Sequence, residues 1–189
     1  AYVDAGSVSA TIAAATGGNF ENLVIDPAAA TTSIGDTIDT TTLSISGDAS
    51  VTEGAPASYT LSLTHPPQGD VTVTLAYGGT AANGADFAGT MTVTIPGGAT
   101  SASFSLATID DALVEGAESF TVGIASASGG NFENLVISGT NGSIATSVTD
   151  NDTTALSVSS PSVPENAGYA QFTVSLSNAS SQTTTVSLA

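Results

Sequence analysis

Residues 127–138 read Ala-Ser-Gly-Gly-Asn-Phe-Glu-Asn-Leu-Val-Ile-Ser, and residues 15–26 read Ala-Thr-Gly-Gly-Asn-Phe-Glu-Asn-Leu-Val-Ile-Asp. The two segments differ at only two positions and lie 112 residues apart. Further along the chain, the segment Leu43-Ser44-Ile45-Ser46 returns 113 residues later as Leu156-Ser157-Val158-Ser159. Solenoid repeats are much shorter, about 20–50 residues, so this period indicates an array of whole domains.

The period divides the 189 residues into three parts. We expect residues 1–39 to be the C-terminal part of a preceding repeat and residues 40–152 to be a complete repeat. Residues 153–189 are then the N-terminal part of a following repeat. The junctions between the parts are short and acidic and lack the Gly/Ser composition of flexible linkers.

The complete repeat alternates apolar with small or polar residues in short runs that are separated by turn signals rich in Gly, Pro, Asn and Asp. This pattern is typical of a β-sandwich, and the chain as a whole is expected to be all-β. The expected strands are seven, at about 42–52, 57–64, 71–77, 89–95, 101–108, 118–125 and 142–149.

The composition excludes several classes of function. The chain has 17 Asp and Glu residues, no Lys or Arg and no Cys. A net charge of −17 argues against binding to nucleic acid or anionic membranes, and no apolar run is long enough for direct membrane insertion. Carboxylates that are held close together need a counter-charge, and without cationic side chains the natural one is a metal ion. Ligands that are all oxygen favour Ca²⁺.

Strand parity predicts where these carboxylates lie. If each strand runs the length of the sandwich, the loops after the first, third, fifth and seventh strands meet at the end where the chain leaves the repeat. Eight of the eleven acids of residues 40–152 fall in or beside those loops: Glu53, Asp86, Asp110, Asp111, Glu115, Glu118, Asp150 and Asp152. Such a tip could hold about two or three calcium ions and clamp the linker to the next repeat. The alternative is a solvated acidic face.

The same residues carry a family resemblance. Val51-Thr52-Glu53-Gly54, then Gly84-Ala85-Asp86-Phe87, then Ile109-Asp110-Asp111 with Glu115 and Glu118, and finally Asp150-Asn151-Asp152 resemble a Calx-β domain, in order and spacing. The resemblance implies an immunoglobulin-like sandwich and a calcium site made by those eight acids. In the first repeat Asp4 stands where Glu115 does, and Asp36 and Asp39 are spaced one residue wider than Asp150 and Asp152. The weaker candidate ligands Asp4, Asp36 and Asp39 would therefore hold fewer ions.

The flanking parts resemble the extender repeats of giant RTX (LapA-like) biofilm adhesins, through residues 2–12 and the Gly-Gly-Asn-Phe-Glu-Asn-Leu segment. This resemblance implies a secreted or cell-surface extracellular protein that does no catalysis and has neighbouring repeats as its partners. We expect a calcium-stiffened extender that projects a distal adhesive domain. The alternatives are a matrix fibre whose copies associate into filaments, a carbohydrate-binding module, disfavoured because Trp is absent, and a calcium-sensing regulatory domain, disfavoured by the tandem flanks.

Overall fold

The computed structural model describes residues 6–35 and 37–188, and all the regular structure in these ranges is β. None of the described residues forms a helix that could cross a membrane. The strands are β1 Ser7–Ala10, β2 Ala30–Ser33, β3 Thr40–Gly47, β4 Ser50–Thr52, β5 Pro56–Leu63, β6 Val71–Gly79, β7 Phe87–Ala88, β8 Thr92–Ile95, β9 Ser101–Thr108, β10 Glu118–Gly129, β11 Asn134–Ile137, β12 Ser143–Thr149, β13 Leu156–Val158 and β14 Val174–Leu176.

Strands β3 to β12 make a sandwich of two five-stranded sheets, with the orders β4-β12-β10-β6-β8 and β11-β3-β5-β9-β7. Neighbouring strands are antiparallel except for β4 with β12 and β11 with β3, which are parallel. Alternate side chains of each strand point to opposite faces of a sheet, so the alternation in the sequence buries one face. In β5, for example, Tyr59, Leu61 and Leu63 are buried.

The core lies between the two sheets, and it contains a polar link between the sheets and a close aromatic stack. The Tyr59 hydroxyl and Thr146 Oγ1 are 2.6 Å apart and fully buried, which joins β5 of one sheet to β12 of the other. Phe87 and Phe120 stack with ring centroids 4.3 Å apart, and both are buried. This stack lies close to the end of the sandwich where the chain leaves, because Phe87 and Phe120 directly follow two of the acidic loops.

All seven expected strands are present, and the structure adds detail that the pattern did not predict. The expected strand 42–52 is two strands in different sheets, β3 and β4. The break occurs where Asp48 Oδ2 accepts a hydrogen bond from the Ser58 backbone N–H at 2.8 Å. Two short strands, β7 and β11, were also not expected. Both are edge strands of the same sheet, and each is a strand only because it pairs with one neighbour that is distant in sequence.

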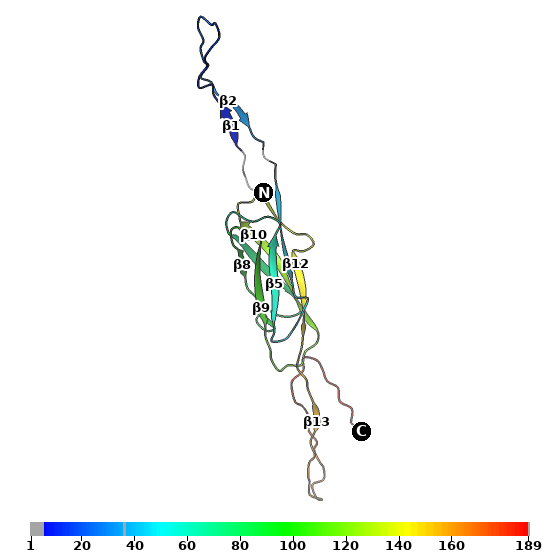
Figure 1. Cartoon of the computed structure of the whole chain (residues 1–189). Coiled ribbons are helices and arrows are strands. Elements are labelled where there is room, and N and C mark those ends of the chain that lie inside the picture. Colours follow the sequence, from blue (N-terminus) through cyan, green and yellow to red (C-terminus); the bar gives the residue numbers. More distant parts are fainter. Residues whose placement is uncertain (1–5, 36, 189) are drawn as a thin grey trace.

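Two separate two-stranded sheets flank the sandwich. The β1–β2 pair extends beyond the end where β3 begins, and the β13–β14 pair extends beyond the end where β12 stops (Figure 1). Every residue of these four strands is exposed. Their apolar side chains, such as Val8 and Leu156, therefore face water in this structure.

Candidate metal centre

The first group of acids is positioned by the parallel pair β4–β12. Thr52 pairs with Thr149 at the end of this ladder, and the Glu53 backbone N–H donates to the Thr149 carbonyl at 3.0 Å. Because both strands run the same way, the residues that follow them leave at the same end of the sheet. Glu53 and Asp150 therefore emerge side by side. Asp152 joins them, and its backbone N–H donates to Asp150 Oδ1 at 2.8 Å.

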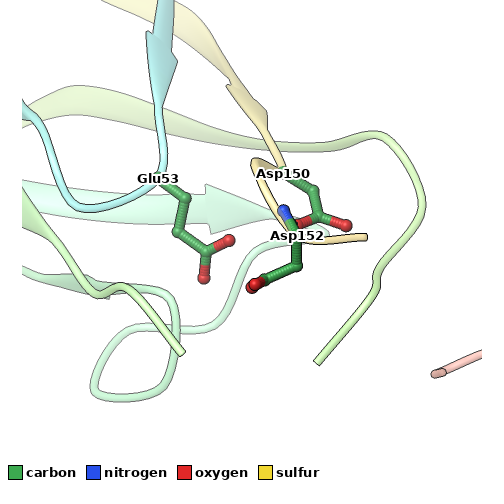
Figure 2. Close-up of side chains that lie close together, drawn as sticks. All are labelled: Glu53, Asp150 and Asp152. Carbon is green, nitrogen blue, oxygen red and sulfur yellow. The ribbon is translucent and has the colours of Figure 1, made fainter. Parts of the chain in front are cut away.

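Glu53, Asp150 and Asp152 each offer a carboxylate oxygen within 4.8 Å of the others. Figure 2 shows Glu53 on one side of this group and the two aspartates on the other. Glu53 Oε2 and Asp152 Oδ2 are buried and have no hydrogen-bond partner among the described residues. Buried carboxylate oxygens without a donor are costly, and a cation would satisfy them.

The electrostatics of this group also favour a bound cation. Burial raises the pKa of the Glu53 carboxyl, and the nearby charges of Asp111 and Asp150 raise it further. Burial also raises the pKa of Asp152, with a further contribution from Asp150. The sequence contains no Lys or Arg that could offset these like charges.

The second group comprises Asp86, Glu115 and Glu118, whose carboxylate oxygens also lie within 4.8 Å of one another. Asp86 precedes β7 and is held by its own turn, since Asp86 Oδ2 accepts the Ala82 backbone N–H at 2.5 Å. Glu118 begins β10. Burial raises the pKa of both Glu115 and Glu118, and the charge of Asp86 raises each pKa further.

The two groups share one small pocket, lined by acids of both groups together with Gly116 and Val148. They are also joined directly, because the Glu115 backbone N–H donates to Asp150 Oδ2 at 2.7 Å. Residues far apart in the sequence thus form one acidic tip. Below, "acidic tip" means Glu53, Asp86, Glu115, Glu118, Asp150 and Asp152.

Asp110 and Asp111 are exposed and belong to neither group. Asp111 Oδ1 accepts the Leu113 backbone N–H at 2.6 Å, which shapes the loop. Asp110 Oδ1 accepts from the Asn151 side chain at 3.0 Å, and the same amide donates to the Glu53 carbonyl at 3.3 Å. Sequence reasoning missed Asn151, which links three of the acidic segments. Its position inside Asp150-Asn151-Asp152 was the only available signal.

Gly54 allows this close approach. Its φ is +78°, and a Cβ at this position would lie 3.0 Å from Asp110 Cβ. A side chain here would therefore be strained by the backbone and would push the loop of Asp110 away from Glu53.

The weaker candidates were expected at the separate tip of residues 1–39, and of these only Asp39 lies among the described residues. Asp4 and Asp36 lie outside the described residues. Asp39 lies at the opposite end of the sandwich, where its backbone N–H donates to Glu133 Oε2 at 2.6 Å. Of the eight stronger candidates, the structure brings six into the two groups, with Asp110 and Asp111 beside them. Their roles as ligands stay predictions.

We expect the metal-free protein to become more stable as the pH falls from neutral toward the ordinary carboxyl range near pH 4. A raised carboxyl pKa means that the folded state takes up protons at a higher pH than the unfolded state does. The stability present below the ordinary carboxyl range, near pH 4, is then lost as the pH rises through the raised pKa values of Glu53, Glu115, Glu118 and Asp152. Thermal unfolding at constant ionic strength, after complete removal of divalent ions, measures this trend.

General repulsion within the acidic chain would also make the protein less stable as the pH rises. Two variants separate this general effect from the effect of the acidic tip. Glu53→Gln should flatten the pH dependence, whereas Glu133→Gln, the same change at the opposite end, should leave it unchanged. A melting temperature that rises with pH in the metal-free protein would contradict the proposed origin.

Comparison with protein families gives two matches. The LapA domain family matches residues 1–37 and 39–151, and the Calx-beta domain family matches residues 148–189. Among curated proteins there is no match.

Solved structures share the fold. The apo form of the Calx CBD1 domain is 21% identical, with a TM-score of 0.51, over 59% of this chain and 98% of that domain. CBD12 from CALX1.2 is 19% identical, with a TM-score of 0.51, over 61% of this chain and 49% of that protein. These likenesses show an immunoglobulin-like Calx-β sandwich and leave the role of this chain to its own residues.

Proposed function

The chain belongs to the LapA domain family, and from this membership we propose that it is a calcium-stiffened structural extender of a large secreted bacterial adhesin. In this role it mediates cell adhesion and biofilm formation by holding a distal binding domain away from the cell surface. The segment does no chemistry. Its work is mechanical, and its stiffness depends on the cation that the acidic tip holds.

The donor set of the acidic tip supports calcium as that cation. All six side chains are carboxylates, and a calcium ion takes six to eight oxygens from carboxylates, carbonyls and water. Nitrogen and sulfur ligands, which zinc and copper prefer, are absent from the tip. With two groups of three carboxylates in one pocket, about two or three ions would neutralise most of the charge there.

The observation that carries the proposal is a contact between the acidic loop 109–117 and the following segment. The Val114 backbone N–H donates to the Ala179 carbonyl at 2.9 Å, and the Ser181 N–H donates to the Val114 carbonyl at 3.0 Å. Val114 directly precedes Glu115, so one loop carries a candidate ligand and the contact to the next repeat. Neutralising the acids would order this loop and fix the junction.

Asp150 and Asp152 add a second restraint at the same junction. They lie in the stretch that leaves β12 and leads to β13. When a cation binds them together with Glu53, the exit of the chain is tied to the body of the sandwich. Without the cation, like charges separate the loops and the junction bends.

We expect small-angle scattering to show an extended and rigid particle in about 10 mM calcium, and the profile of a flexible chain after chelation. Extracellular calcium modules commonly bind in the range of about 0.1–1 mM, so this concentration is saturating. Magnesium at the same ionic strength is the control for charge screening. Identical profiles with and without calcium would contradict the proposal.

Two proline variants test the junction itself. Ser181→Pro removes the N–H that donates to Val114, so the particle should stay flexible even in calcium. Ser180→Pro is the matched control, because the two junction hydrogen bonds do not use the Ser180 N–H. The middle repeat also carries a proline, Pro67, at the corresponding position.

A further inference from the structure

The repeated segment Gly-Gly-Asn-Phe-Glu-Asn has no part in the acidic tip. Its copy at residues 129–134 connects β10 to β11 at the end of the sandwich where β3 begins, and the same six residues recur at 17–22. Each residue of the copy at 129–134 has a structural task. Two of them contact the stretch through which the chain enters the sandwich.

The first three residues of the segment form a turn that few residue types can adopt. The φ angles of Gly129, Gly130 and Asn131 are +99°, +79° and +54°, all in the left-handed region. A Cβ at Gly129 would collide with the Asp70 carbonyl oxygen, so only glycine fits there. Asn131 is the one non-glycine residue with a positive φ among the described residues, and asparagine tolerates this conformation better than most. The turn therefore reverses the chain between β10 and β11 in one defined way.

Two further contacts anchor this turn to the body of the sandwich. Phe132 is half-buried and packs against the core, and its ring lies against the position that a Cβ of Gly130 would occupy. The Gly130 carbonyl accepts the Gln68 backbone N–H at 3.0 Å, which ties the turn to the loop between β5 and β6. The residues that follow are thus presented from a fixed support.

Glu133 and Asn134, which we call the linker clamp, bind the chain where it enters the sandwich. Glu133 Oε2 accepts the Asp39 backbone N–H at 2.6 Å, and the Asn134 side-chain amide donates to Thr40 Oγ1 at 3.1 Å. Asn134 and Thr40 are also partners at the start of the parallel β11–β3 ladder. A hydrogen bond from an N–H to a carboxylate is about twice as strong as a neutral one. Consecutive side chains therefore hold the last residue before β3 and the first residue of β3.

The two ends of the sandwich hold the chain by different means. At the acidic tip the exit of the chain carries Asp150 and Asp152, whose charges repel that of Glu53 unless a cation binds between them. At the opposite end Glu133 faces an N–H donor, so its contact with the linker needs no cation.

The attachment of the chain changes just before Asp39. Ile38 is 80% exposed. Further back, the Ile34 backbone N–H donates to the Gly6 carbonyl at 2.8 Å, which extends the pairing of the β1–β2 hairpin. Residues 35–38 thus join a residue held by that hairpin to a residue held by the linker clamp.

We propose that the segment Gly-Gly-Asn-Phe-Glu-Asn is a linker-binding site, in which Glu133 and Asn134 fix the entering linker to the repeat that follows it, with or without calcium. When the cation is removed, the linker stays with the following repeat, and the junction bends within residues 35–38. The linker clamp goes beyond the extender function and needs no calcium, whereas the position of the bend rests on that function.

Backbone nitrogen relaxation by NMR tests the linker clamp on the 189-residue chain after complete removal of divalent ions. The order parameter of the Asp39 N–H should be about 0.85, the value of a rigid backbone, and that of Gly35 should be below about 0.6. Glu133→Ala removes the acceptor. The order parameter of Asp39 should then fall toward that of Gly35, and the Asp39 amide should exchange with water at least about tenfold faster.

Two variants control for effects other than the lost hydrogen bond. Glu133→Gln should keep most of the order at Asp39, because the side-chain oxygen of glutamine still accepts the N–H. Glu21→Ala is the same change in the other copy of the segment, which lies in the loop between β1 and β2, away from Asp39 (Figure 1). It should leave Asp39 unchanged. The amide of Leu61 in β5 should stay protected in every variant, so a loss of folding is distinguishable from a loss of the clamp.

A mobile Asp39 in the metal-free wild type would overturn the linker clamp, and so would a Glu133→Ala variant in which Asp39 keeps its order and its slow exchange. Neither result bears on the extender function, which scattering with and without calcium tests. If Asp39 is rigid but calcium leaves the scattering profile unchanged, the extender function fails and the linker clamp stands. A Gly35 that stays rigid while chelation makes the particle flexible would contradict the position of the bend.

Discussion

Saturating calcium should raise the melting temperature of the central sandwich by roughly 10 °C for each ion that binds. A ligand that binds only the folded state stabilises it by about 2.7 kcal/mol at 100 times its dissociation constant. For a domain of this size, 1 kcal/mol corresponds to about 4 °C or more. In addition, the acids whose pKa values are raised destabilise the metal-free state. The melting temperature without calcium is therefore low. Calorimetry with calcium and after chelation measures the difference.

Glu53→Gln separates the two contributions to this difference in melting temperature, which are the destabilisation of the metal-free protein and the binding of calcium. The variant removes one buried carboxylate that has an unsatisfied oxygen, so the metal-free protein should melt higher than the wild type. The calcium affinity should fall by at least about tenfold, because a ligand is lost. The metal-free and calcium-bound melting temperatures therefore move in opposite directions. Glu133→Gln should change neither. If calcium leaves the wild-type melting temperature unchanged, the acids are a solvated face.

The position of the acidic tip could be predicted from the sequence because it depends on two robust features. Alternation placed the strands, and counting the strands placed every second loop at one end. Glu53, Asp86 and Asp150 follow from this count, whatever the details of pairing. The low number of acids at the opposite end was predictable in the same way, and among the described residues Asp39, Asp70 and Glu133 lie there.

The grouping within the tip could not be predicted, because it depends on contacts between strands that are distant in sequence. Glu53 and Asp150 lie together since β4 crosses to the second sheet and pairs in parallel with β12. Within residues 42–52 the Gly47-Asp48 pair is a turn signal, but it does not indicate that the chain crosses to the other sheet there. Asp110 and Asp111 show the same limit. They lie in the exposed first part of the loop 109–117, and loop conformation is decided by hydrogen bonds such as that of Asn151.

The largest effect of a single substitution is expected for Phe87→Ala, about 3–5 kcal/mol of unfolding free energy, together with weaker calcium binding. Phe87 is 1% exposed and stacks on Phe120, which is 0% exposed. Phe87 directly follows Asp86, and Phe120 lies two residues after Glu118. The aromatic stack therefore fixes the separation of two carboxylates of the acidic tip. Denaturant unfolding with and without calcium measures both consequences.

Leu61→Ala is the matched control for the structural part of this prediction. Leu61 is also 0% exposed, but it lies in β5 and contributes no neighbour to the acidic tip. The Leu61→Ala substitution should lower the free energy of unfolding by about 2–5 kcal/mol. The variant should still gain the full stabilisation by calcium. Phe87→Ala should lose part of that increment, because Asp86 and Glu118 are then no longer held at a fixed distance. Equal calcium increments in the two variants would mean that the stack supports the core alone and does not position the ligands.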